Sequence, residues 1–307
     1  MAIITPALIK ALAVGFRKEY QDALQAVQPT YTRIATVVPS STASNTYGWL
    51  GQFPAFREWV GARVIKDMEA SGYSITNKLF ESTVGVKRTD VEDDAVGVYA
   101  PLFQEMGRAA AIYPDEHVYG MLNAARATLC YDGQFFFDTD HPVYANVDGT
   151  GDVTPTSNII TGAGADVGPW WYLLDCSRAI KPIIFQRRIA PEFTSMTEVT
   201  DENVFSLDQY RYGSRARSNV GVGFWQMGIA SNRILNSDSF DQAYDLMRGF
   251  KGDGGRPLDL KATDLLVPVT LRAKANATIK VARLESGADN ANYNLVNVLD
   301  TAFLAAA

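Results

Sequence analysis

The first strongly periodic stretch of the chain is residues 5–27, where apolar side chains recur every three or four positions. The periodic residues are Leu8, Leu12, Phe16, Tyr20, Leu24 and Val27. Thr5 can cap the first turn, and Pro6 occupies the first helical position, where its missing N–H costs no hydrogen bond. The pattern predicts an amphipathic helix whose apolar stripe must be covered by its own chain or by a neighbouring molecule.

Residues 62–88 have a different pattern, with two β-rich runs on either side of Ser71 and Gly72. Apolar residues such as Tyr73 are few in this segment and widely spaced. We predict a long hairpin that turns at Ser71 and Gly72. An isolated hairpin is marginally stable in water, so this one should lie against another surface.

Two helices are predicted between residues 89 and 126. Thr89 and Glu92 have the spacing of a capping box ahead of the first helix. Pro114 should end that helix, because proline cannot donate the next backbone hydrogen bond. Asp115 can then cap a second helix that runs to about Arg126.

The second half of the chain changes character three times. Residues 130–168 are rich in glycine and are predicted to be mostly loop. Residues 170–231 are β-rich, and we expect a long hairpin that turns through residues 213–218. From residue 236 to residue 300, helical and strand patterns alternate, which indicates a compact α/β unit.

Charge and cysteine content narrow the possible functions. The 307 residues carry a net charge of -6 with both signs spread along the chain, so the sequence has no general basic footprint for nucleic acid. The two cysteines form no CxxC motif, which fits a reducing compartment. Lys10 interrupts the apolar N-terminal run, so we expect no secretion signal. No apolar run approaches the roughly 20 residues that span a bilayer.

The arginines of residues 170–233 are the best candidates for contact with a charged partner. Eight basic residues stand against six acidic ones in this stretch, which leaves a local charge of only +2. That excess is too small for a groove that follows nucleic-acid phosphates. Complementary pairs, within one subunit or between subunits, account better for the pattern.

The stretch CYDGQFFFDTDHPV, residues 130–143, is the part that most resembles an active site. Asp138, Asp140 and His141 could serve as metal ligands or as an acid–base group. A catalytic zinc or iron site usually needs three protein ligands, often two of them histidine, and the chain has two histidines in all. The simpler interpretation is a loop held by Asx-type turns and anchored by residues 135–137. We therefore expect no catalytic, cofactor or metal site, with a metal-dependent enzyme as the alternative.

Several long motifs resemble the major head (capsid) subunits of Mu-like tailed bacteriophages and prophages. They are TASNTYGWLGQFPAFREWVG (42–61), YSITNKLFESTVGVKR (73–88), YDGQFFFDTDHPV (131–143), WYLLDCSRAIKPIIFQRR (171–188), YRYGSRARSNVGVGFWQM (210–227) and DGGRPLDLKATDLLVPVTL (253–271). The resemblance runs nearly end to end.

The resemblance implies an α+β chain with the HK-97-like capsid fold. Residues 1–45 would be the N-terminal arm and 46–88 the E-loop hairpin region. Residues 89–235 would form the peripheral domain, with the spine helix at about 89–127. Residues 236–307 would belong to the axial domain and the C-terminus.

The implied function is structural. Copies of the chain would form hexamers and pentamers of an icosahedral shell that encloses double-stranded DNA without sequence-specific binding. Expected partners are portal, scaffold or protease proteins and decoration proteins, with the shell assembled in the bacterial host cytoplasm and found in the virion. The candidate contacts between subunits are Leu8, Leu12, Phe16, Tyr20, Ser71, Gly72, Tyr73, Arg187, Arg188, Arg215 and Arg217. The alternatives are an encapsulin-like compartment shell of the same fold and a virion tail or decoration protein.

Overall fold

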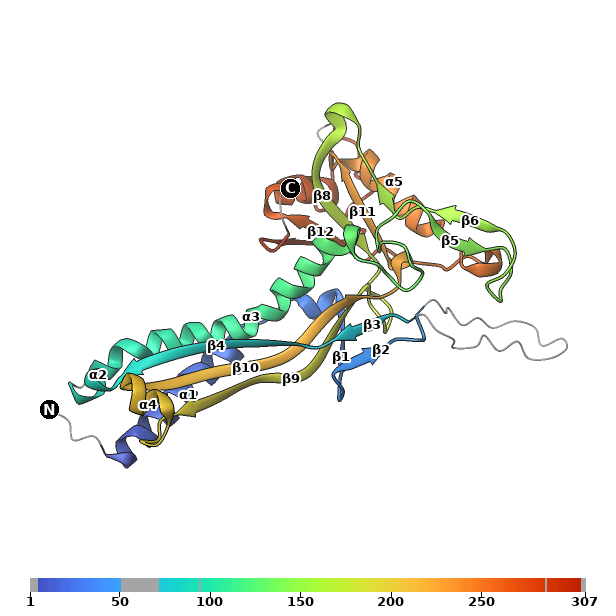
Figure 1. Ribbon diagram of the computed structural model, residues 1–307. Coiled ribbons are helices and arrows are strands. Elements are labelled where there is room, and N and C mark those ends of the chain that lie inside the picture. The colour runs from blue at the N-terminus through green and yellow to red at the C-terminus, as the bar shows by residue number, and fades with distance from the viewer. Residues whose placement is uncertain (1–4, 51–71, 94, 285, 305–307) are drawn as a thin grey trace.

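Two sheets organise the molecule into a long part and an upper part (Figure 1). The computed structural model describes residues 5–50, 72–93, 95–284 and 286–304. The sheet of the long part has the order β1 (Ala35–Pro39), β9 (Ile183–Met196), β10 (Gln209–Val222), β4 (Lys78–Lys87). The sheet of the upper part has the order β13 (Asn297–Thr301), β12 (Asp264–Pro268), β8 (Val167–Leu174), β11 (Gly228–Arg233), β7 (Ile159–Ile160). The mixture of helices and sheets confirms the predicted α+β class.

Helix α1 (Pro6–Ala26) packs against α3 (Ala100–Ala124) and the sheet of the long part. Thr5 caps α1 by accepting a hydrogen bond from the Leu8 backbone N–H, as the sequence predicts. The Phe16 ring stacks on Phe103 with centroids 4.2 Å apart and meets Tyr212 edge-on at 5.3 Å. The apolar stripe of α1 is therefore covered by its own chain.

Helix α3 runs unbroken through Pro114, so the predicted division into two helices is wrong. Figure 1 shows that α3 runs along the long part and then bends into the upper part. Pro114 is buried, and packing of this face of the helix against the rest of the chain offsets the lost hydrogen bond. Asp115 caps no second helix. Its carboxylate instead accepts hydrogen bonds from the backbone N–H groups of Thr30 and Tyr31, just after α1.

The capping box predicted at Thr89 is absent. Helix α2 (Arg88–Glu92) already begins at Arg88, and no side chain caps it. The short 3-10 helices are η1 (Tyr31–Arg33), η2 (Ala95–Tyr99), η3 (Ala125–Ala127), η4 (Gly164–Asp166), η5 (Trp225–Met227), η6 (Asp253–Gly255) and η7 (Val269–Leu271).

Strand β10 passes straight through residues 213–218, where the sequence predicts a turn. Small side chains at Ser214, Ala216 and Ser218 alternate inward, while Arg215 and Arg217 point away from that buried side. This period of two is typical of a strand with one covered face. The chain reverses earlier instead, where helix α4 (Glu202–Leu207) joins β9 to β10.

The region predicted as one long hairpin divides between two sheets. Strand β3 (Ser74–Thr76) pairs with β2 (Ser44–Thr46), whereas β4 pairs with β10. The run 62–70 and Ser71 lie outside the described residues. Within the described residues, the second run of the predicted hairpin therefore has other partners than expected.

The upper sheet combines strands from before and after residue 235. Helices α5 (Ser237–Arg248) and α6 (Arg272–Ile279) and strands β12 and β13 follow the predicted alternation. However, β12 also pairs with β8, and β8 pairs with β11, so the sheet includes strands from before residue 235. The segment predicted as loop also contains a hairpin, β5 (His141–Tyr144) with β6 (Val153–Thr156).

Candidate functional site

A buried cluster gathers around His141, but with other partners than the sequence suggests. The His141 Nδ1 atom lies 2.8 Å from Asp132 Oδ2. The Cys130 thiol donates to Asp132 Oδ1 at 2.8 Å. We call Cys130, Asp132 and His141 the Cys-Asp-His cluster. Its donor atoms all lie within 4.8 Å of one another, so among the described residues this group could hold a metal ion.

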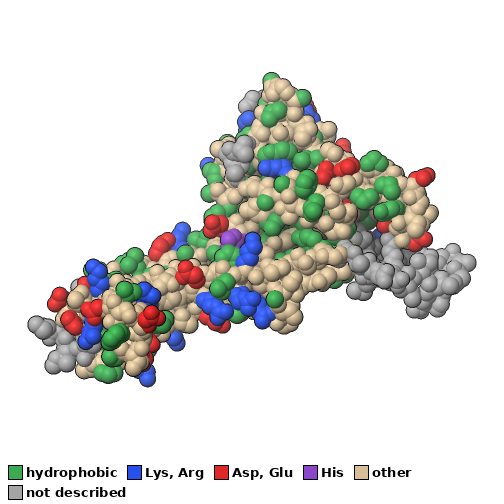
Figure 2. Space-filling view, viewed as in Figure 1, with side chains coloured by type: hydrophobic (Ala, Val, Ile, Leu, Met, Phe, Trp, Pro, Cys, Tyr) green, Lys and Arg blue, Asp and Glu red, His purple; other side chains and the backbone are tan. Residues whose placement is uncertain are grey.

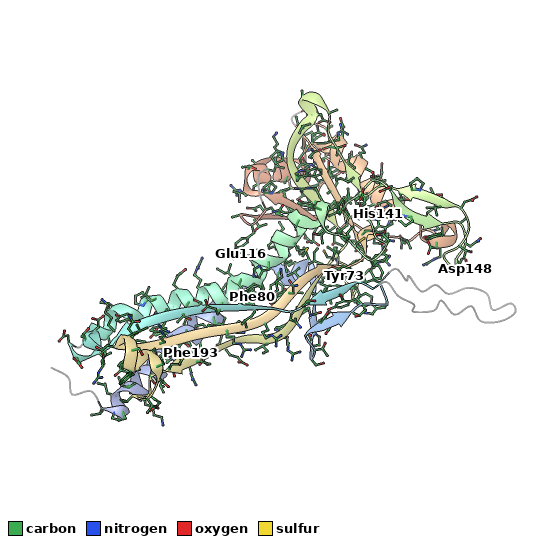
Figure 3. All side chains as sticks on the ribbon, in the orientation of Figure 1. Tyr73, Phe80, Glu116, His141, Asp148 and Phe193 are labelled. Atoms are coloured by element: carbon green, nitrogen blue, oxygen red, sulfur yellow. The ribbon has the colours of Figure 1, made fainter. Side chains whose placement is uncertain are left out.

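The other side of His141 is equally enclosed. The imidazole is fully buried and stacks on Trp225 with ring centroids 4.0 Å apart and an interplanar angle of 6°. The Nε2 atom lies 3.3 Å from Asn158 Oδ1. Since Trp225 follows β10 and precedes β11, His141 packs on the crossing between the two sheets. Figure 3 shows His141 in the upper part, near its junction with the long part.

Asp138 and Asp140 are not brought together with His141 as ligands. Asp138 accepts hydrogen bonds from the backbone N–H groups of Phe135 and Thr139, so it satisfies loop backbone groups as predicted, but not through the Asx-type contact two residues ahead. Asp140 is exposed. Phe136 and Phe137 are buried as the expected anchors, but Phe135 remains partly exposed.

The electrostatics of the Cys-Asp-His cluster disfavour nucleophilic chemistry. Burial, reinforced by the neighbouring Asp132 carboxylate, raises the pKa of the Cys130 thiol. Burial acts to raise the pKa of Asp132 as well, but hydrogen bonds from His141 and Cys130 outweigh it and lower that pKa. A buried thiol that resists ionisation is a poor nucleophile.

The predicted contact residues of α1 divide into two groups. Phe16 and Tyr20 are 5% and 1% exposed, because α3 and β10 already cover them. In this conformation their side chains belong to the core of the chain. Leu8 and Leu12 are half-buried at the edge of the same helix.

The residues predicted at and beside the hairpin turn differ in their exposure. Gly72 is exposed, and Ser71 lies outside the described residues. Tyr73 turns inward, where its hydroxyl accepts a hydrogen bond from the backbone N–H of Val222 at 2.7 Å. The Tyr73 side chain therefore forms contacts within its own chain.

Four arginines of β9 and β10 form no direct ion pair among the described residues. Arg215 lies opposite Glu81 on one neighbouring strand and Glu192 on the other. Within the described part of the chain, no carboxylate forms an ion pair with Arg187, Arg188, Arg215 or Arg217. Other arginines of the predicted set do pair within the chain, since Arg178 lies near Asp175 and Arg233 near Asp166.

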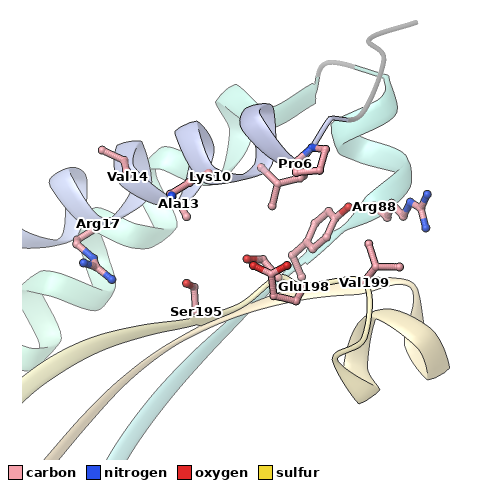
Figure 4. A pocket seen from close by; sticks show the side chains of 12 residues that line it. Pro6, Lys10, Ala13, Val14, Arg17, Arg88, Ser195, Glu198 and Val199 are labelled. Carbon is pink, nitrogen blue, oxygen red and sulfur yellow. The ribbon is translucent and has the colours of Figure 1, made fainter.

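The sequence analysis did not predict an apolar tip at the end of the long part, because it assigned residues 204–212 to the β-rich region. We define this tip as Val199, Phe205 and Leu207. The Phe205 side chain on α4 is 88% exposed, and Val199 and Leu207 beside it are also exposed. A groove of about 600 Å³ lies between this end of β9 and the start of α1. Figure 4 shows Lys10, Arg17 and Glu198 around it. Exposed apolar side chains next to a groove are typical of a contact surface.

Within the residues that the structure describes, no helix combines the length and the apolar character needed to cross a bilayer.

Comparison with known proteins gives matches that extend over almost the whole chain. The family described as "Mu-like prophage major head subunit gpT" matches residues 9–304. The major capsid protein of Escherichia phage Mu is 52% identical over 273 residues, which cover 89% of each chain. The "Mu-like prophage FluMu major head subunit" of Haemophilus influenzae is 49% identical over 295 residues, or 94% of this chain and 93% of the relative.

Solved structures agree with the sequence matches. A chain from the procapsid of bacteriophage JBD30 superposes with a TM-score of 0.86 at 62% identity, covering 98% of this chain and 100% of that one. A chain from the JBD30 capsid gives a TM-score of 0.75 at 49% identity, with 99% and 100% covered. The fold is therefore that of a phage capsid subunit, as the HK-97-like prediction requires.

Proposed function

The chain belongs to the family of Mu-like prophage major head subunits, and we propose that its copies associate as hexamers and pentamers of an icosahedral shell. Its function is to form the head shell of a tailed phage. The observation that carries this conclusion is the match to a procapsid subunit over nearly the full length of both chains. The family is one of structural proteins.

The shell encloses double-stranded DNA without reading its sequence. Both signs of charge are interspersed over the long part on the face that Figure 2 shows, and the net charge is -6. A wall without a strong positive field does not hold phosphates tightly, so DNA can move along it during packaging. A strongly basic inner face in an assembled shell would contradict this part of the proposal.

Contacts between subunits use the surfaces that one copy leaves open. They are the outer edge of α1 at Leu8 and Leu12, the unpaired arginines of β9 and β10, and the tip around Phe205. Contacts between different patches can close into rings and shells when the rotation between copies permits it. Each subunit then gains several weak contacts at once, and their sum stabilises the closed particle.

Other head proteins complete the particle. We expect portal, scaffold or protease proteins and a decoration protein among them. Support for decoration comes from one similar structure, a JBD30 capsid "decorated with minor capsid protein trimers". Assembly in the host cytoplasm is consistent with Cys130 and Cys176, which are both free thiols.

Electron microscopy of the expressed chain tests this function. The chain is expressed alone and together with its neighbouring head genes, and the particles are purified, imaged and treated with nuclease. We expect closed shells, and protected DNA when the packaging proteins are present. Tubes alone would favour a tail protein, and closed shells that never contain DNA would favour an encapsulin-like compartment.

Charge reversal tests the contact surface separately. The double variant R215E/R217E places a new carboxylate opposite Glu81 and Glu192, so urea unfolding of the unassembled variant must first show that the fold is kept. Its yield of shells should fall strongly, because two favourable contacts per subunit become repulsive. Normal shell yield from this variant would exclude the arginine surface as an interface.

A further inference from the structure

The orientation of Asn158 determines what can lie beside His141. Asn158 is fully buried, and its amide group donates to the backbone carbonyls of Phe136, Trp225 and Gly228 at 2.8–3.2 Å. Its Oδ1 atom must therefore be the atom that faces His141 Nε2. That oxygen can only accept, so the Nε2 atom carries a hydrogen.

In a neutral imidazole this assignment would leave two acceptors facing each other on the opposite side of the ring, so the hydrogen bond from His141 to Asp132 needs a second ring proton, whose place a metal ion can take. The remaining nitrogen of His141, Nδ1, is 2.8 Å from a carboxylate oxygen of Asp132. A lone pair and a carboxylate at that separation need a positive species between them, either a proton or a metal ion. The Cys130 sulfur approaches the same carboxylate at 2.8 Å, which adds a third metal-binding atom.

We propose that Cys130 Sγ, the Asp132 carboxylate and His141 Nδ1 form a binding site for a divalent transition-metal ion of the zinc class. Thiolate, imidazole and carboxylate are the ligands that zinc accepts together, whereas magnesium and calcium prefer oxygen ligands alone. Asn158 supplies the outer hydrogen bond that metal-binding histidines typically have on their second nitrogen.

The ion would act as a structural clamp. It joins residues 130–132 to the start of β5, and His141 in turn stacks on Trp225 at the crossing between the two sheets. The Cys130 thiol donates a hydrogen bond to Asp132 Oδ1, so it carries a proton before the ion enters. Binding forms the sulfur–metal bond and releases the thiol proton to water. The ion would stabilise the fold of the single chain, and this effect needs neither a catalytic reaction nor assembly of the shell.

Cobalt(II) is the direct probe, because a cobalt–thiolate bond gives a near-ultraviolet charge-transfer band. The full-length chain is stripped with EDTA, desalted and titrated with Co²⁺ and then with Zn²⁺, while bound metal is counted by mass spectrometry. We expect one ion per chain, a thiolate band that Zn²⁺ removes, and no competition from Mg²⁺.

The chain supplies its own matched controls, since it contains two cysteines and two histidines. The band should disappear in Cys130→Ser and bound metal should fall at least tenfold in His141→Gln. Cys176→Ser and His117→Gln should bind as the unchanged protein does. Metal binding by the unchanged chain tests the proposal even if a variant of the Cys-Asp-His cluster fails to fold. If it binds less than about a tenth of an ion per chain and shows no thiolate band, a proton alone occupies the site and the proposal is wrong. Equal binding by all four folded variants would also overturn it.

Discussion

Gly107 is the point at which α3 comes closest to α1, and a single methyl group there should separate the two helices. A Cβ atom built at Gly107 would lie 2.2 Å from the backbone oxygen of Tyr20 and 3.1 Å from Ala23 Cβ. The first contact is with backbone, so no side-chain rotation can relieve it. Helix α1 would have to move by about 1 Å, which is the kind of overpacking that costs about 1–3 kcal/mol.

Gly120 on the same helix provides a control for helix propensity. A Cβ atom at Gly120 would meet nothing within 4 Å. Replacing glycine by alanine inside a helix stabilises the helix by about 1 kcal/mol at either position. The difference between Gly107→Ala and Gly120→Ala therefore isolates the steric term, and we expect Gly107→Ala to be about 1–3 kcal/mol less stable.

Urea unfolding of the unassembled chain measures this difference. Protease cleavage within α1 should also accelerate in Gly107→Ala, because the displaced helix loses contacts around Phe16 and Tyr20. Equal unfolding free energies for the two variants, with equal cleavage rates, would show that α1 does not pack on α3 as described. The arm would then be free to leave its own subunit.

Three further variants test other parts of the account. Asp115→Ala leaves the Thr30 backbone N–H without its carboxylate partner, so urea unfolding should show a loss of about 3 kcal/mol, and no loss would contradict the described hydrogen bonds. Phe205→Ser should change the unfolding free energy by less than about 0.5 kcal/mol, since this ring is exposed in its own chain. If the tip contacts a neighbouring copy, as we propose, the variant should also reduce shell yield in sedimentation; unchanged yield would remove the tip from the interface. The Asp166 pKa is lowered mainly by its hydrogen bond from Arg233. Its carboxylate therefore stabilises the fold above the unfolded pKa of about 3.9, and this contribution is lost as the pH falls through the lower folded value. Asp166→Asn should be less stable than the unchanged chain at pH 7 and equally stable in strong acid, and a gap that persisted in acid would refute the assignment.

Elements with a clear period were predictable from the sequence. Helix α1 begins at Pro6 because Thr5 caps it, and strand β12 consists of Asp264 followed by the apolar run 265–268. Helix α5 has its apolar residues at helical spacing. In each case the local pattern and the packing of the finished fold favour the same structure.

Pro114 and strand β10 show where local rules failed. Proline disfavours a helix interior, but burial of the face of α3 that carries Pro114 outweighs that local cost. The residues 213–218 contain glycine and serine, which favour turns, yet their inward and outward alternation was the more reliable signal. Tertiary packing decided both cases, and the sequence does not display packing directly.

The Cys-Asp-His cluster was only partly predictable. His141 was a candidate, but proximity in sequence pointed to Asp138 and Asp140 as its partners. The loop turns instead, so that Asp132 reaches His141 and Asn158 closes the other side. Asn158 lies 17 positions further along and contributes through a contact that no spacing rule indicates.

Sedimentation velocity of the purified full-length chain, alone and with its co-expressed head proteins, tests the central claim most directly. The claim is that the unpaired arginines and the apolar tip find their partners on other copies. The account predicts fast-sedimenting closed particles, at the latest when the other head proteins are present. A stable 33.6 kDa monomer under every condition would contradict it.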